Sequence, residues 1–219
     1  MQGAGAHPPA STGRIFGIGL SRTGTRSLLL ALQGLGFRAV HYPFDSVTER
    51  ELFEEDGRLS LLEDNDALLD LPAASFFARL DRCYPGSRFV LTTREREEWI
   101  DAVADHYDGL IAGWDGYPKR FRDFGERITA RAYGSWPPTR AGIAAAGDRH
   151  LRAVEDHFSG RPGDLLRLDV CDGGGWKELA AFLGIEEEQI EAGFPHARDE
   201  DETMAEGVER TLFKEEVEA

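Results

Sequence analysis

The chain has 219 residues, of which 41% are hydrophobic, so it can bury one substantial core. Its formal charge at pH 7 is −15, and residues 186–219 hold 13 Asp/Glu against 3 Lys/Arg. An acidic balance argues against a nucleic-acid partner and against attraction to an anionic membrane surface, because both need a basic face. Two cysteines, Cys83 and Cys171, are too few for a disulfide framework, have no metal-ligand spacing, and fit a reducing cytoplasm.

The domain organisation that we expect is simple. The sequence shows no apolar run long enough to span a bilayer, and its first residues lack the basic and apolar regions of a signal peptide. We expect residues 1–13 to be a disordered leader, residues 14–198 to form one domain, and residues 199–219 to be an acidic tail.

Residues 14–37 are the most informative stretch of the chain. They read as a short apolar strand at 15–18, a Gly/Ser/Thr turn at 19–25, and a helix with leucines at helical spacing. Glycines let backbone N–H groups approach an anion, and the helix adds its unpaired N-terminal donors. This stretch therefore predicts a phosphate loop, with the charges of Arg22 and Arg26 and the hydroxyls of Thr23, Thr25 and Ser27 beside it. An ordinary turn with incidental glycines is the alternative.

Further strands and helices alternate along the rest of the chain. The spacing predicts strands at 37–41, 67–72, 88–93 and 163–170, and helical segments at 45–64, 73–83, 95–107, 140–158 and 176–183. Residues 108–138 are rich in aromatics and arginines with weak periodicity, so we expect irregular helices or a lid there rather than part of the core. Aromatic side chains of this region either line an acceptor pocket or anchor the segment to the core: Trp114, Tyr117, Phe121, Phe124, Tyr133 and Trp136.

This alternation indicates an α/β protein with a P-loop NTPase-like three-layer fold, in which a central parallel sheet is flanked by helices. Ligands of such folds bind at the carboxyl ends of the strands. Gly19, Asp70, Arg94 and Asp169 all fall at or just beyond predicted strand ends. We therefore expect them to converge on one site.

The loop does not fit the two commonest nucleotide motifs. A Walker loop requires a lysine after its second glycine, and Thr25 occupies that position here. A dinucleotide-binding fingerprint counted from Gly17 would place its third glycine at Arg22. The missing lysine weakens the case for ATP or GTP hydrolysis, although a P-loop kinase or hydrolase with a substituting arginine stays open as an alternative.

Residues 19–28 resemble the 5′-phosphosulfate loop of sulfotransferases that use 3′-phosphoadenosine 5′-phosphosulfate (PAPS). Residues 88–94 and the helix after them are similar to the family's second signature, a strand that ends in the arginine binding the 3′-phosphate. Residues 164–170, 176–184 and 194–196 resemble the C-terminal part of a largely microbial and fungal branch. The resemblance covers about residues 14–198 and keeps the order of the segments.

The resemblance implies a PAPS-dependent sulfotransferase that acts on a hydroxyl or amine of a small-molecule acceptor. Its 5′-phosphosulfate would be held by backbone amides and side chains of the loop: Ser21, Arg22, Thr23, Gly24, Thr25, Arg26 and Ser27. Arg22 stands where many cytosolic members carry a lysine, and it can neutralise charge but cannot donate a proton. Arg94 would hold the 3′-phosphate. Such catalysis relies on positioning and electrostatic stabilisation and requires no metal.

The acceptor needs a base to receive its proton. Asp70 aligns by position with the segment that carries the catalytic histidine of cytosolic members, so it is the first candidate; its alternative role is a helix N-cap. His41, at the end of the second strand, is the other candidate, or it completes the edge of the core. The histidines on helical patterns are expected to be structural or solvent-facing: His106, His150 and His157.

One position departs from the family pattern. The serine that usually follows the 3′-phosphate arginine by eight residues is Ala102 here, and Arg96, Thr93 or a group from 108–138 would have to replace its hydroxyl. This departure and the unassigned base leave a second alternative, a catalytically inactive nucleotide-binding protein of the same fold. The basic residues of the acidic tail, Arg198, Arg210 and Lys214, have no assigned role.

Overall fold

Five parallel strands form the centre of the molecule. The computed structural model describes residues 13–54, 56, 58–170, 175–185, 193–195 and 197. Its strands are β1 (Ile15–Gly17), β2 (Ala39–His41), β3 (Ala67–Leu69), β4 (Arg88–Thr93) and β5 (Leu165–Asp169). They lie in the order β2-β3-β1-β4-β5, and every pairing is parallel. The predicted α/β fold with a central parallel sheet is therefore confirmed.

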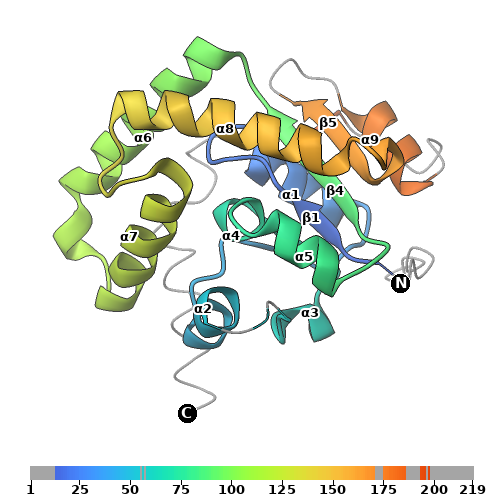
Figure 1. Ribbon diagram of the computed structural model, residues 1–219, viewed down its shortest axis with the longest axis horizontal. Helices are drawn as coiled ribbons and strands as arrows, with labels where there is room; N and C mark the ends of the chain where they lie inside the picture. The colour runs from blue at the N-terminus through green and yellow to red at the C-terminus, as the bar shows by residue number, and fades with distance from the viewer. Residues whose placement is uncertain are drawn as a thin grey trace, which may run out of the picture.

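Helices cover both faces of this sheet (Figure 1). They are α1 (Thr25–Gly34), α2 (Ser46–Phe53), α3 (Leu61–Asp64), α4 (Leu71–Ala74), α5 (Phe77–Cys83), α6 (Arg96–Ala112), α7 (Lys119–Tyr133), α8 (Arg140–Phe158) and α9 (Trp176–Leu183), with 3-10 turns at Trp114–Gly116 and Pro162–Asp164. On one face α1 and α9 pack through Leu28, Leu32 and Leu179. On the other face α4 to α8 bury a larger core around Phe16 and Phe89. The strand residues alternate between these cores because successive side chains point to opposite faces.

Several predicted boundaries shift in the structure. The helix expected at 73–83 is two helices, because the chain bends at Ser75 and Phe76 between α4 and α5. The helix expected at 95–107 continues to Ala112, since Leu110 extends its buried stripe by one more turn. The strands are also shorter at some ends than expected, with β2 beginning at Ala39.

The expectation of irregular helices outside the core in 108–138 was wrong for residues 119–133. They form the regular helix α7, whose Phe121, Phe124 and Ile128 are at most 2% exposed. The pattern was hard to read because charged residues separate the buried ones and make the helix polar on average. All six aromatics of the region contact the core, the role that the sequence left open beside an acceptor pocket. The lid stays a prediction.

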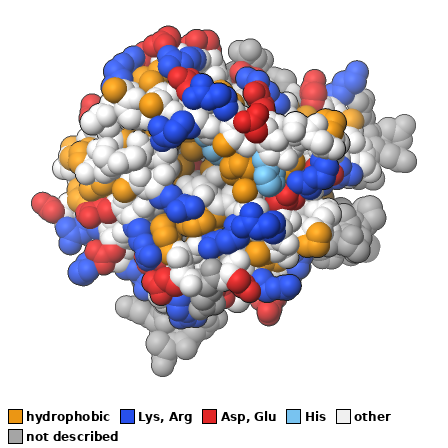
Figure 2. Space-filling view, viewed as in Figure 1, with side chains coloured by type: hydrophobic (Ala, Val, Ile, Leu, Met, Phe, Trp, Pro, Cys, Tyr) orange, Lys and Arg blue, Asp and Glu red, His pale blue; other side chains and the backbone are white. Residues whose placement is uncertain are grey.

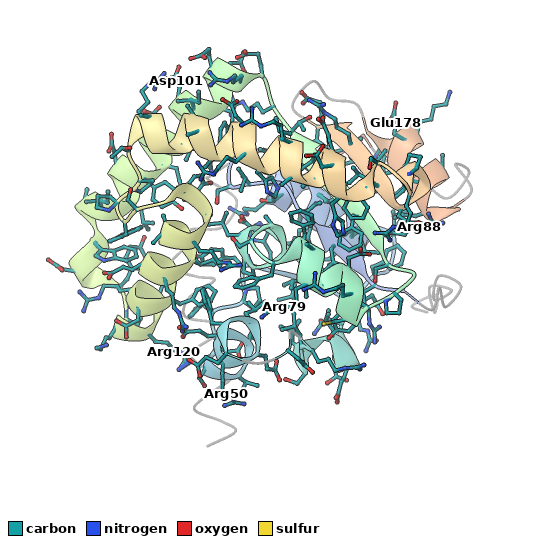
Figure 3. All side chains as sticks on the ribbon, viewed as in Figure 1. Arg50, Arg79, Arg88, Asp101, Arg120 and Glu178 are labelled. Carbon is teal, nitrogen blue, oxygen red and sulfur yellow. The ribbon has the colours of Figure 1, made fainter. Side chains whose placement is uncertain are left out.

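Arginines fix α7 against its neighbours. The guanidinium of Arg127 lies 3.9 Å from the ring centre of Phe53, and that of Arg131 lies 4.1 Å from the ring centre of Phe76. Arg79 stacks on Phe76 from α5 at 4.7 Å and donates to a carbonyl of α2 (Figure 3). Figure 2 shows Lys and Arg side chains gathered at the lower centre of the viewed face, where α7 approaches α2 and α5. These stacked cations hold α2, α5 and α7 together.

Candidate active site

The loop between β1 and α1 requires glycine at two positions. Gly24 has a φ of 96°, and a Cβ there would lie 2.1 Å from a methyl group of Val170. A Cβ on Gly19 would lie 1.9 Å from the Thr92 hydroxyl. Arg22 also has a positive φ, 69°, which is uncommon for a residue with a side chain. The backbone is thus held in an unusual conformation directly before α1, whose N-cap residue, Gly24, has no side chain that could cap the first turn. Its amides are available to an anion.

Side chains of β4 and α6 hold the loop in place. The Thr23 hydroxyl donates to the Leu20 carbonyl at 2.7 Å and lies 2.7 Å from the Thr92 hydroxyl. The indole N–H of Trp99 donates to the Ser21 carbonyl at 3.0 Å. The Thr23 hydroxyl, predicted to bind the donor, here supports the loop from within. Thr92 and Trp99 were not singled out as site residues, since their role depends on contacts between residues more than 65 positions apart.

Asp70 lies directly after β3 and is 7% exposed. Its Oδ1 accepts hydrogen bonds from the Leu71 amide at 2.7 Å and from the Ser21 hydroxyl at 3.3 Å. Its backbone has φ 74° and ψ −161°, a region that is nearly restricted to glycine. Asp70 therefore does cap the short helix α4, the alternative role that its sequence position suggested. Strained backbone of this kind is concentrated at functional sites.

The two candidate bases are in contact with each other. Nε2 of His41 lies 3.2 Å from Oδ2 of Asp70 and 3.0 Å from the Thr25 hydroxyl oxygen. The contact with Thr25 has the geometry of a hydrogen bond, and the tautomer of His41 decides which of its two atoms is the donor. The structure thus joins the predicted base residues to the first residue of α1.

Tyrosines surround this pair on the side of α6 and α7. Burial is the main cause that raises the pKa of Tyr42, Tyr107 and Tyr133 above the ordinary value, and the charge of Asp70 raises each further. The three phenols therefore stay protonated and can act as hydrogen-bond donors at neutral pH. Sequence reasoning did not find this group, because the three residues come from a strand end and two helices that only the fold brings together.

The other predicted donor residues lie around the same loop. Arg94 follows β4, is 30% exposed, and pairs with Glu98 at 3.4 Å. This partly exposed pair is weak enough to exchange for a phosphate. The Ser27 hydroxyl accepts a hydrogen bond from the Ala197 amide at 3.1 Å, so the chain after α9 returns to the start of α1. Arg26 extends from the first turn of that helix. Arg198, Arg210 and Lys214 lie outside the described residues, as do residues 1–12 of the expected leader and the expected acidic tail at 199–219.

Arg96, one of the groups considered as a replacement for the hydroxyl missing at Ala102, has carboxylate partners of its own. Arg96 forms a two-pronged ion pair with Asp148 of α8, with a shortest N···O distance of 3.1 Å. Ala102 itself lies within α6 and brings no hydroxyl.

The histidines expected to be structural have structural partners in two cases: Nε2 of His150 contacts the Ile18 carbonyl, and Nε2 of His157 contacts Asp81.

A cavity of about 500 Å³ opens elsewhere, at the amino ends of the strands. Arg14, Arg58, Glu51 and Tyr84 are among the residues that line it. The cavity contains carboxylates and lies at the amino ends of the strands, whereas ligands of parallel α/β sheets bind at the carboxyl ends. It is therefore not part of the anion site. No group of three or more His, Cys, Asp or Glu residues in the described ranges is arranged to hold a metal ion.

Comparison with known proteins agrees with the geometry of the loop. A family model described as "Sulfotransferase domain" matches residues 14–203. The chain is also 24% identical over 218 residues to Ava biosynthesis cluster protein M of Aspergillus versicolor, an alignment that covers 84% of this chain and 80% of that protein. Of the helices that the structure describes, none combines the length and apolarity needed to cross a bilayer. The chain belongs to the sulfotransferase domain family.

Proposed function

We propose that this protein transfers a sulfuryl group from PAPS to a hydroxyl or amine of a small-molecule acceptor. Family membership supports sulfuryl transfer, and the loop after β1 supports an anionic donor. The name of the Aspergillus relative places it in a biosynthesis cluster, which favours a small-molecule acceptor. The scarcity of cysteines favours action in the cytoplasm.

The residues present fit such a donor. The uncapped amides at the start of α1 and the positive-φ turn at Arg22 and Gly24 suit the 5′-phosphosulfate. The guanidinium of Arg22 would neutralise charge that develops on the leaving phosphate. Arg94, at the next strand end, would take the 3′-phosphate in exchange for Glu98. The hydroxyl of Thr25, at the first position of α1, would contact a sulfonate oxygen.

The contact between His41 and Asp70 is the single observation that carries a catalytic role. In an in-line displacement the acceptor oxygen or nitrogen bonds to sulfur while the bond from sulfur to the bridging oxygen breaks, and the acceptor loses a proton. The pair lies 3.2 Å apart beside the loop and can receive that proton. Because the two side chains lie this close together, we assign the base to the pair rather than to one member.

The experiment is a transfer assay with PAPS and a panel of phenols, alcohols and amines, read as formation of 3′-phosphoadenosine 5′-phosphate. We expect acceptor-dependent product without added metal. ATP and GTP with magnesium form a second arm that tests the P-loop kinase or hydrolase. Turnover in that arm and none with PAPS would contradict the proposal. Binding of PAPS without transfer to any acceptor would favour the inactive nucleotide-binding protein.

A further inference from the structure

Two buried tyrosines lie between the aromatic core and the phosphate loop. Tyr107 of α6 and Tyr133, the last residue of α7, are 4% and 1% exposed, and their ring centres are 5.7 Å apart. The Tyr107 hydroxyl has a partner, the Thr129 hydroxyl at 3.0 Å. Both rings are thus fixed by packing, and at least one hydroxyl has a structural purpose.

The Tyr133 hydroxyl differs from that of Tyr107. Its oxygen is buried and forms no hydrogen bond of good geometry within the described residues. It nevertheless lies close to Ser21, near both the side chain and the backbone of that loop residue. A buried hydroxyl without a partner costs free energy, and a phenylalanine would fill the same space without that cost. Core packing therefore accounts for the ring of Tyr133 but not for its hydroxyl.

Ser21 connects this hydroxyl to the acid–base pair. Its carbonyl accepts from the Trp99 indole, and its own hydroxyl donates to Asp70 at 3.3 Å, a long hydrogen bond. Hydrogen bonds at catalytic sites are often long before ligands bind and shorten in the complex. A second donor on Ser21 would hold the loop and Asp70 in a fixed relation.

We propose that Tyr133 is a positioning residue whose buried hydroxyl donates to Ser21 when an anion occupies the phosphate loop. The inference rests on the proposed function only in taking this loop as the anion site. It gives the segment 108–138 a defined role: Tyr133, the last residue of α7, would hold the loop, while Arg127 and Arg131 hold α7 itself on Phe53 and Phe76.

Inorganic pyrophosphate and 3′-phosphoadenosine 5′-phosphate are the two probes, titrated by calorimetry into wild type and Tyr133→Phe. We expect both affinities to fall by about five- to tenfold in the variant, the usual size for one hydrogen bond. The thermal midpoint should stay the same or rise, because the variant removes a buried, unpartnered hydroxyl. Tyr117→Phe is the matched control: Tyr117 packs on Trp114 and Phe121 in the same segment, and its loss of a hydroxyl should change neither affinity.

A double variant tests the route through Ser21. If Tyr133 acts on the Ser21 hydroxyl, Ser21→Ala with Tyr133→Phe should bind pyrophosphate no more weakly than Ser21→Ala alone. Unchanged affinities in Tyr133→Phe, or a lowered thermal midpoint with unchanged affinities, would overturn the proposal. If wild type binds pyrophosphate but not the nucleotide, the PAPS proposal fails and the role of Tyr133 is still tested. If wild type binds neither probe, both proposals fail.

Discussion

The sheet has a histidine–aspartate pair at each of its two edges, and the pairs are built differently. At the carboxyl edge, His41 lies 3.2 Å from Asp70. At the amino edge, His157 of α8 lies 2.8 Å from Asp81 of α5. Both aspartates are largely buried, with 9% and 10% of their side chains exposed. The residue types therefore do not distinguish the two sites.

Their partners do. Asp81 also receives Arg161 at 2.6 Å, so its carboxylate is matched by a permanent cation. Burial raises the pKa of Asp81, but the hydrogen bonds and charges of Arg161 and His157 outweigh it and lower that pKa below the ordinary value. Asp70 instead receives a loop hydroxyl and an amide, and its backbone is strained. A carboxylate matched by arginine joins helices, whereas one set beside an anion loop is placed for proton transfer.

The largest difference between the two histidine–aspartate pairs should appear in kcat when the carboxylate charge of each is removed in turn. Asp70→Asn should lower kcat by about 10²–10⁴-fold, the range for loss of a general base, while binding of 3′-phosphoadenosine 5′-phosphate persists. Asp81→Asn is the matched control and should keep kcat. The transfer assay with the best acceptor of the panel measures both. Equal losses in the two variants would remove the distinction between the edges, and an unaffected Asp70→Asn would transfer the role of base to His41.

Two glycines with a positive φ allow the phosphate loop to be compared with a turn at the amino ends of the strands. Gly24 has φ 96° and no room for a Cβ, whereas Gly86, in the turn before β4, has φ 80° and open space around it. Gly24→Ala should cost about 2–4 kcal/mol and abolish anion binding, and Gly86→Ala should cost about 1 kcal/mol and leave binding intact. Denaturant titration and calorimetry measure these effects. Similar costs for both would contradict the close approach of Val170.

The pair of His157 and Asp81 should contribute to the stability of the fold and not to the rate of transfer. Asp81→Asn should lower the free energy of unfolding by about 1–2 kcal/mol at pH 7. Because the folded protein lowers the Asp81 pKa, this contribution is present above the unfolded value of about 3.9 and is lost as pH falls through the folded value. Wild type and variant should therefore converge in stability in strong acid. A constant difference at all pH values would contradict this account of Asp81.

His150 should show the smallest effect. Burial lowers its pKa below the ordinary value, although the hydrogen bond with the Ile18 carbonyl opposes this shift. As pH falls through about 6.5, the unfolded chain takes up a proton before the folded one does, so stability decreases. His150→Gln should flatten the pH dependence of the unfolding free energy between about pH 5 and 7. An unchanged slope there would assign the dependence to other groups.

The sequence predicts the elements with strong local signals. The spacing of apolar residues and the glycine pattern predict the loop of 19–25 and the strand at 88–93. The alternation of strands and helices predicts that Gly19, Asp70, Arg94 and Asp169 lie at the carboxyl ends of parallel strands. The parallel sheet then brings His41 near Asp70, because β2 and β3 are neighbours and end in register. The two candidate bases were therefore both correctly located at this edge, although their contact was not foreseen.

What could not be predicted depends on contacts across the fold. The strain at Asp70 and the Thr23–Thr92 contact leave no local pattern, since they arise from the packing of loops and strands distant in sequence. Tyr133 stands in a helix whose charged residues hid its buried stripe. Hydrophobic period locates an element, but it does not report which hydroxyl of a buried aromatic faces a site.

Calorimetric titration with 3′-phosphoadenosine 5′-phosphate tests the central claim most directly, because it needs no knowledge of the acceptor. Wild type should bind without added magnesium, Arg94→Ala and Arg22→Ala should bind at least tenfold more weakly, and Arg96→Ala, whose guanidinium pairs with Asp148, should bind like wild type. Absence of binding to wild type, or equal affinity in Arg94→Ala and Arg96→Ala, would contradict a PAPS site at the carboxyl edge of this sheet.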